Sequence, residues 1–180
     1  MDEVVFVHVP KTGGTSIRTV LGRPHDHTTA AQYVERLGHD EWRRRLTFAV
    51  ARHPFDRFVS AWAFLLGMRP GRKGWQQARQ SREAMLRYGT MDAFIRAGAQ
   101  AMFEVHAFRP QVQWITLMPR LLLRFESLDE QFQSHFGKQL PHANASERLP
   151  WQNTLTPQHR ELLAQVYAAD FNRLGYQTET

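Results

Sequence analysis

The chain has 180 residues, 42% hydrophobic and 22% charged, and its 23 lysines and arginines outnumber its 17 acidic residues to give a net charge of +6. This composition is that of a folded globular chain and excludes the disordered and fibrous classes. The sequence contains no cysteine, which excludes a disulfide framework, an iron–sulfur cluster, a cysteine-ligated zinc site and a thiol nucleophile. The excess of positive charge predicts an anionic partner.

The hydropathy of the chain predicts a location and a domain count. No stretch approaches the roughly 20 apolar residues that a membrane-spanning helix needs, and the acidic residues after Met1 do not resemble the start of a signal peptide. We therefore expect a soluble, cytoplasmic protein without a membrane span. No repeat or linker divides the sequence, so residues 1–180 are expected to form a single domain.

Strands and helices alternate in the first third of the sequence, and helices predominate after it. In chain order, the predicted elements are a strand over 4–9, helices over 15–21 and 30–38, a strand over 47–51, helices over 54–66, 76–88 and 91–97, a strand over 121–125, a helix over 128–136, a loop over 137–156 and a helix over 157–174. Thr29 and Thr90 are predicted helix caps. A strand–turn–helix unit that occurs twice indicates an α/β fold with parallel strands.

The first strand is followed by a segment suited to binding an anion. Residues 8–16 read His-Val-Pro-Lys-Thr-Gly-Gly-Thr-Ser. The two glycines permit a tight turn that directs backbone N–H groups inward, and the following helix adds its positive end. Lys11, Thr15 and Ser16 supply a cation and two hydroxyls. The segment is not a Walker A loop, because Lys11 precedes both glycines instead of following them.

A second segment offers a further anion site. Residues 52–60 read Arg-His-Pro-Phe-Asp-Arg-Phe-Val-Ser. Arg52 ends a predicted strand, where the side chains of an open α/β sheet face the ligand crevice. Ser60 lies about two turns into the next helix. A guanidinium and a hydroxyl directed at one dianion form favourable charge-assisted hydrogen bonds, although this segment alone is better explained as a strand end with a surface ion pair.

Together the two segments resemble the sulfotransferase family that uses 3′-phosphoadenosine 5′-phosphosulfate. The resemblance is to its carbohydrate branch, which contains the heparan sulfate 2-O- and chondroitin sulfotransferases and small bacterial members. It continues more weakly through 106–111, 124–128 and 170–176. It implies a three-layer α/β fold related to the P-loop kinases, with a small central parallel sheet flanked by helices.

The resemblance also implies roles for individual residues. Lys11 would contact the transferred sulfuryl group, and Arg52 and Ser60 would hold the 3′-phosphate of the donor. The residues implied for the 5′ end of the donor are Lys11, Thr12, Gly13, Gly14, Thr15 and Ser16. Arg148 is placed near the 3′-phosphate. The product would be 3′,5′-bisphosphoadenosine, and no metal is expected.

Transfer to a hydroxyl also needs a base, and histidine is the first candidate because its ordinary pKa lies nearest neutrality. His25-Asp26-His27 is similar to a histidine segment of the 2-O-sulfotransferases, which makes His27 the predicted base and His25 a supporting residue. His106 is the second candidate for the base. Beside Arg109, it is also interpreted as an acceptor-binding residue or as part of the core.

The predicted function is therefore sulfuryl transfer from this nucleotide donor to a hydroxyl of a sugar or small metabolite. One alternative is a small-molecule kinase with a P-loop-type fold, which would need a Mg²⁺-binding acid and a lysine after the glycines. Another is a basic, non-enzymatic module that binds nucleotide or nucleic acid, although the favoured interpretation includes no nucleic-acid partner. A family member that binds nucleotide without turnover is a third. Glu126 is expected to brace a strand–helix junction, and the basic stretch 69–73 to be a solvated loop.

Overall fold

The computed structural model describes residues 4–22, 26–141 and 149–178. The chain divides into two compact units, which are described separately. Unit 1 comprises Met1–His53 and Gln111–Ala145, and unit 2 comprises Pro54–Pro110 and Ser146–Thr180. That residues 1–180 act as a single domain stays a prediction. No helix of the described ranges is long and apolar enough to cross a membrane.

Unit 1 is built on a three-stranded parallel sheet in the order β1-β2-β3. Its strands are β1 (Val4–Val7), β2 (Leu46–Ala51) and β3 (Leu121–Arg124). β2 lies in the centre and is almost entirely buried, which is why its sequence is a continuous apolar run. The predicted α/β fold with a small parallel sheet flanked by helices is confirmed.

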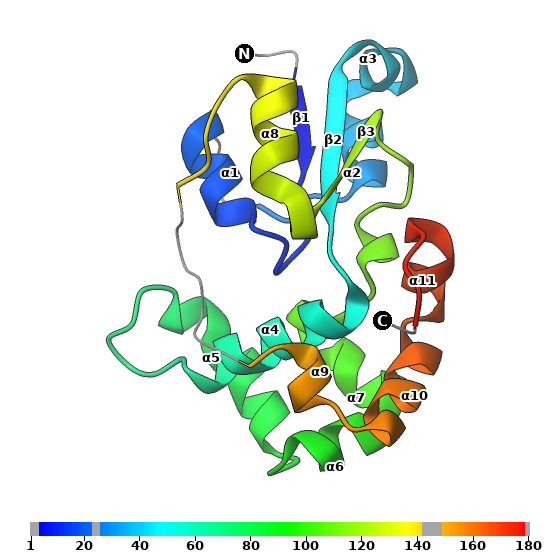
Figure 1. Ribbon diagram of the computed structural model, residues 1–180. Helices are drawn as coiled ribbons and strands as arrows, with labels where there is room; N and C mark the ends of the chain where they lie inside the picture. Colours follow the sequence, from blue (N-terminus) through cyan, green and yellow to red (C-terminus); the bar gives the residue numbers. More distant parts are fainter. Residues whose placement is uncertain (1–3, 23–25, 142–148, 179–180) are drawn as a thin grey trace. The chain divides into compact units, whose positions relative to one another are not determined.

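Two helices, α1 (Gly14–Leu21) and α8 (Leu128–Phe136), cover one face of this sheet (Figure 1). Unit 1 also contains α2 (Ala30–Leu37) and α3 (His39–Arg44). Ile17 of α1 and Phe132 of α8 pack against Phe6 and Phe48 of the strands, and all four side chains are buried. The predicted cap of α2 is confirmed, because the Thr29 hydroxyl accepts the N–H of Gln32 at 3.2 Å.

The sequence did not predict α3, whose six residues form fewer than two turns. Glu41 of this helix accepts hydrogen bonds from Arg44 at 2.9 Å and Arg45 at 3.0 Å. These two bonds, that from Arg44 first, lower the pKa of Glu41 to about 2. The pairs lie at the surface, where such ion pairs contribute little to stability.

Unit 2 is helical in the residues described. Its helices are α4 (Pro54–Leu66), α5 (Trp75–Leu86), α6 (Met91–Arg96), α7 (Gly98–Glu104), α9 (Trp151–Thr154), α10 (Pro157–Val166) and α11 (Ala168–Leu174), with a 3₁₀ turn η1 (His106–Phe108). Two predictions were wrong here. The predicted loop over 137–156 contains α9, which begins at the buried Trp151. The predicted helix over 157–174 breaks at Tyr167, whose backbone leaves the helical region and whose hydroxyl donates to the Phe108 carbonyl at 2.7 Å.

The core of unit 2 surrounds α4. Phe55, Phe58 and Phe108 are fully or almost fully buried there. Arg57 is also buried, with only 1% of its surface exposed, and its guanidinium donates to the carbonyl oxygens of Ala107 at 2.9 Å and Arg109 at 2.6 Å. Carbonyl acceptors thus replace the water that a buried cation loses.

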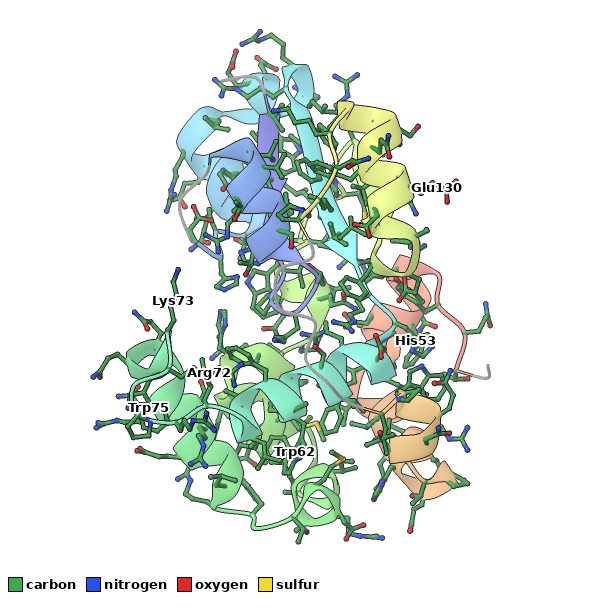
Figure 2. All side chains as sticks on the ribbon, turned by 60° about the vertical axis from the view of Figure 1, so that its left-hand side comes forward. His53, Trp62, Arg72, Lys73, Trp75 and Glu130 are labelled. Carbon is green, nitrogen blue, oxygen red and sulfur yellow. The ribbon has the colours of Figure 1, made fainter. Side chains whose placement is uncertain are left out.

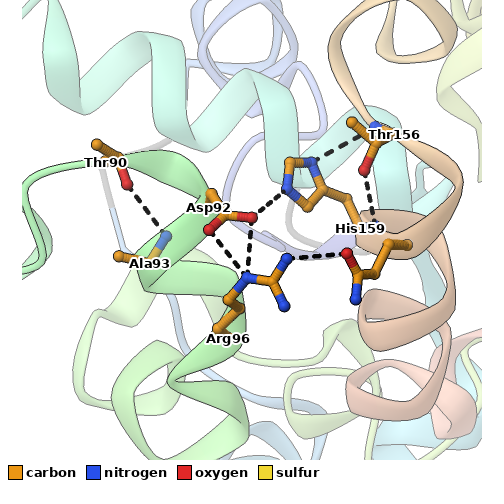
Figure 3. Close-up of polar contacts among 7 residues, drawn as sticks. Thr90, Asp92, Ala93, Arg96, Thr156 and His159 are labelled. Atoms are coloured by element: carbon orange, nitrogen blue, oxygen red, sulfur yellow. Dashed lines mark hydrogen bonds and ion pairs between the residues drawn. The ribbon is translucent and has the colours of Figure 1, made fainter.

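A polar cluster lies on the surface of unit 2 between α6 and α10 (Figure 3). Asp92 accepts hydrogen bonds from Arg96 at 2.9 Å and from His159 at 3.0 Å, and these two partners, Arg96 first, lower the pKa of Asp92. Arg72 and Lys73 lie on an exposed loop, and the Lys73 side chain points outward (Figure 2). The stretch 69–73 is therefore solvated, as predicted.

Candidate functional site

The loops that follow the three strands of unit 1 meet at the carboxyl edge of the sheet, which is where open α/β folds bind ligands. The segment 8–13 follows β1, Arg52 follows β2 and Phe125 follows β3. The Arg52 guanidinium lies 3.8 Å from the centre of the Phe125 ring. It also donates to the Lys11 carbonyl oxygen at 2.8 Å. Arg52 therefore links all three loops.

The loop between β1 and α1 has an unusual backbone. Lys11 has a φ of 70°, the one positive φ at a non-glycine position in the described ranges. Such a conformation costs an L-residue about 1–2 kcal/mol, and strain of this kind gathers at functional sites. The Thr12 hydroxyl closes the turn by donating to the Val9 carbonyl at 2.9 Å. Arg52 and Thr12 thus hold the loop in a shape that presents Lys11 beside α1.

The N-terminus of α1 is left open by its own residues. Gly13, with φ 80°, is the N-cap, and no side chain forms a capping hydrogen bond there. Gly14 and Thr15, as the first residues of α1, have no acceptor for their N–H groups within the helix. The positive end of the helix dipole lies at the same point. These donors, together with Lys11, can hold a phosphate-like anion.

Gly14 is required at its position because the His8 ring occupies the space where a side chain would begin. A Cβ at Gly14 would lie 1.9 Å from His8 Nε2. The ring itself is held from the other side, since His8 Nδ1 donates to the Asp26 carbonyl oxygen at 3.0 Å. His8 is only 4% exposed, so its ring is packed inside unit 1.

The same strand end positions His27, the predicted base. Its Nδ1 lies 2.9 Å from the carbonyl oxygen of His8, and the two rings are 4.3 Å apart between centroids. Because a carbonyl oxygen only accepts, Nδ1 of His27 must carry a proton, and the neutral ring keeps its lone pair on Nε2. The His8 side chain therefore contacts Gly14 on one side and the His27 ring on the other.

Two side chains brace Arg52 and the residue after it. Gln111 pairs with the backbone of Arg52 in both directions: its Oε1 accepts the Arg52 N–H at 2.9 Å, and its Nε2 donates to the Arg52 carbonyl at 2.8 Å. Glu126 accepts the N–H of His53 at 2.7 Å. Glu126 does brace a strand–helix junction as predicted, although it is the junction that follows β2.

The predicted site residues are distributed over both units. Those that unit 1 brings to the carboxyl edge of its sheet are Lys11, Thr12, Gly13, Gly14, Thr15, Ser16, His27 and Arg52. Unit 2 contains Ser60, buried on α4, and the pair His106 and Arg109, of which Arg109 donates to the Phe103 carbonyl at 2.8 Å. His25 and Arg148 lie outside the described residues.

Three residues that hold this site were not assigned to it from the sequence. Gln111 was part of a quoted segment of the family resemblance, which was the available signal for it. Phe125 was predicted as the last residue of a strand and lies in the quoted segment 124–128, and His8 was quoted only as the first residue of the segment 8–16. Their partners lie far away in the sequence, so local patterns do not reveal them.

In the described ranges, no group of three histidine or acidic side chains is arranged to hold a metal ion.

The loop after the first strand, the open helix and the parallel sheet together define a P-loop-like α/β protein. A family model described as "Sulfotransferase family" matches residues 1–177. The chain therefore belongs to the sulfotransferase family, whose members transfer a sulfuryl group. No curated protein and no solved structure matches the chain in the corresponding searches.

Proposed function

We propose that this chain transfers a sulfuryl group from 3′-phosphoadenosine 5′-phosphosulfate to a hydroxyl of a sugar or small metabolite. The observation that carries the proposal is the loop between β1 and α1. There Lys11 is held in a left-handed conformation beside a helix whose first turn has no side-chain cap. The 5′-phosphate would be held by Gly13, Gly14 and the residues after them, because their N–H groups and the helix dipole favour an anion.

We assign the charge compensation to Lys11 and the proton transfer to His27. The bound donor supplies a sulfuryl group, whose bond to the phosphate breaks as the acceptor oxygen attacks. Lys11 offsets the charge that develops on the departing phosphate. Nε2 of His27 takes the hydroxyl proton, because the bond from Nδ1 to His8 leaves the lone pair there. His25 is proposed to assist, and membership of the carbohydrate branch is proposed from the resemblance of the segments 8–16 and 52–60.

Donor binding is tested first by thermal stabilisation with 3′,5′-bisphosphoadenosine and, separately, with ATP and Mg²⁺. We expect stabilisation by the bisphosphate without metal, and we expect Lys11→Met to weaken it. Lys138→Met is the matched control, since it removes an exposed lysine of the same unit. Stabilisation by ATP and Mg²⁺ alone would reject the proposal and favour the kinase alternative.

The role of Arg52 is tested by removing one phosphate from the ligand. If Arg52 holds the 3′-phosphate, Arg52→Met abolishes the preference for 3′,5′-bisphosphoadenosine over adenosine 5′-monophosphate. If Arg52 only braces the loop through the Lys11 carbonyl, the variant weakens the binding of both ligands equally. Ser60→Ala is measured in the same way, because Ser60 and Arg148 are the other residues proposed for this phosphate.

The base is tested by separating turnover from binding. Transfer of ³⁵S from the labelled donor to a panel of hydroxyl compounds identifies an acceptor. His27→Asn keeps a donor toward His8 but lacks the second nitrogen. We expect it to bind 3′,5′-bisphosphoadenosine normally and to lose about 10²–10⁴-fold in turnover. His135→Ala, which changes an exposed histidine of α8, is the control. Full activity of His27→Asn would move the assignment to His25 or His106.

A further inference from the structure

A cavity of about 280 Å³ lies in unit 1 along the outer edge of β1. The residues of its lining that matter here are Phe6, His8, Arg18, Tyr33, Arg36 and Arg45. They come from β1, from α1 and α2, and from the position just before β2. Residues 11–16 of the loop described above are not part of the lining, so this cavity is separate from the proposed donor site.

The lining carries three arginines and one carboxylate, that of Asp26. Arg45 also pairs with Glu41, through a contact of 3.0 Å, so part of its charge is compensated. The Nε of Arg18 is buried and has no hydrogen-bond partner among the described residues, while the Asp26 carboxylate compensates part of the Arg18 charge. A buried charged donor without an acceptor is costly. The cavity therefore has a net positive lining and at least one donor suited to an anionic acceptor.

The remaining residues of the lining limit the polarity and size of a ligand that the cavity can hold. Val4, Phe6 and Leu37 make part of it apolar, and the Tyr33 hydroxyl, 3.4 Å from the Phe6 carbonyl oxygen, adds a polar group. The volume lies just below the usual range of about 300–1,000 Å³ for ligand pockets, which indicates a small ligand or one sugar-sized part of a larger one. His8, whose ring contacts that of His27, forms one wall.

We propose that this cavity binds the oxyanion group, carboxylate, sulfate or phosphate, of a small ligand, with Arg18 and Arg36 as its principal donors. Planar guanidinium groups match the geometry of oxyanions and form charge-assisted bonds with them. The oxyanion is either a free anion or part of a larger molecule that extends toward His27. The site is separate from the donor site and does not depend on the proposed sulfuryl transfer.

The test is a titration with sodium sulfate followed in ¹H–¹⁵N correlation spectra, at an ionic strength kept constant with sodium chloride. The backbone signals of Arg18, Tyr33 and Arg36 report on the cavity, and those of 13–16 report separately on the donor loop. We expect saturable shifts at the cavity. Arg18→Gln and Arg36→Gln should each weaken this binding about tenfold or more. Arg36 is exposed, so its variant tests the site even if Arg18→Gln perturbs the fold.

Arg79→Gln is the matched control, because it removes the same charge from an exposed position on α5. The proposal is overturned if the cavity signals do not saturate, if only the signals of 13–16 move, or if Arg79→Gln weakens binding as much as Arg36→Gln. Glucose 6-sulfate and glucose distinguish the two sources of the oxyanion. Tighter binding of glucose 6-sulfate than of sulfate assigns the cavity to part of a larger ligand, and equal binding assigns it to a free anion. Binding of glucose alone, unaffected by Arg36→Gln, would contradict the proposal.

Discussion

Gly14→Ala is the substitution whose consequence follows most directly from the structure. The new Cβ would lie 1.9 Å from Nε2 and 2.0 Å from Cδ2 of His8, whereas non-bonded atoms do not approach a Cβ within 3.0 Å. The backbone of Gly14 does not have a positive φ, so alanine is not strained there. The whole cost therefore comes from moving the imidazole ring.

The magnitude depends on how firmly the ring is held. His8 donates to the Asp26 carbonyl at 3.0 Å and packs between the rings of Phe6 and His27, with centroid distances of 5.5 and 4.3 Å. Overpacking of a filled site costs about 1–3 kcal/mol, and loss of the hydrogen bond adds about 1 kcal/mol. We expect Gly14→Ala to lower the free energy of unfolding by about 2–4 kcal/mol.

Urea unfolding followed by circular dichroism measures this change, and a double-mutant cycle identifies its cause. In a His8→Ala background the space is empty, so Gly14→Ala should cost at least about 1 kcal/mol less than it does in the wild type. Gly38→Ala is a useful comparison, because Gly38 has a φ of 82° and no neighbour within 4 Å of the built Cβ. Its cost arises from backbone strain and should not change in the His8→Ala background. An equal cost of Gly14→Ala in both backgrounds would refute the steric explanation.

Three further predictions concern stability. Arg57→Met should lower the free energy of unfolding by about 2–5 kcal/mol, because the charge-assisted hydrogen bonds from the buried guanidinium to the carbonyl oxygens of Ala107 and Arg109 are lost; a loss below about 1 kcal/mol in urea unfolding would contradict this. Gln111→Ala should cost about 2–4 kcal/mol, because the two hydrogen bonds that the Gln111 amide makes with the N–H and C=O of Arg52 are lost. Gln111→Glu should be intermediate, because it keeps only the acceptor, and equal costs of the two variants would argue against the paired bonds. The pKa of Glu41 is about 2 in the folded chain against an ordinary value of 4.5. The contribution of Glu41 to the free energy of unfolding is therefore present above pH 4.5 and is lost as the pH falls toward 2. Glu41→Gln should therefore lose less stability over that interval, and urea midpoints at pH 7, 4.5 and 2.5 that fall in parallel with the wild type would exclude this linkage.

Elements with strong local signals were predicted closely. α8 has the predicted bounds, and α4 begins at Pro54, because proline is suited to the first turn of a helix. The caps at Thr29 and Thr90 act as predicted, since a capping hydroxyl bonds within three residues of its own position. α7 and α9 were missed. They are short helices, which are not stable from local interactions alone and depend on packing.

Some features of the candidate site were likewise predictable from adjacent residues, and others depend on distant partners. The anion-binding character of the loop was predictable because Lys11, the glycines and the helix they precede are adjacent in the sequence. The roles of His8 and Gln111 were not, because their partners are distant: Gln111 and Arg52 are 59 positions apart, and His27 and His8 are 19 apart. Only the folded chain brings these groups within hydrogen-bond distance.

Part of the excess positive charge of the chain can now be assigned to positions in the fold. By itself the sequence determined an α/β chain with a basic, glycine-containing loop after its first strand, because strand, turn and helix signals act over a few residues. The tertiary structure decided which nitrogen of His27 is left to accept a proton, why residue 14 must be glycine, and that Arg18, Arg36 and Arg45 line one cavity beside β1. These properties arise from contacts between residues that are not neighbours in the sequence, where packing and hydrogen bonding, rather than local preference, set the position of each side chain.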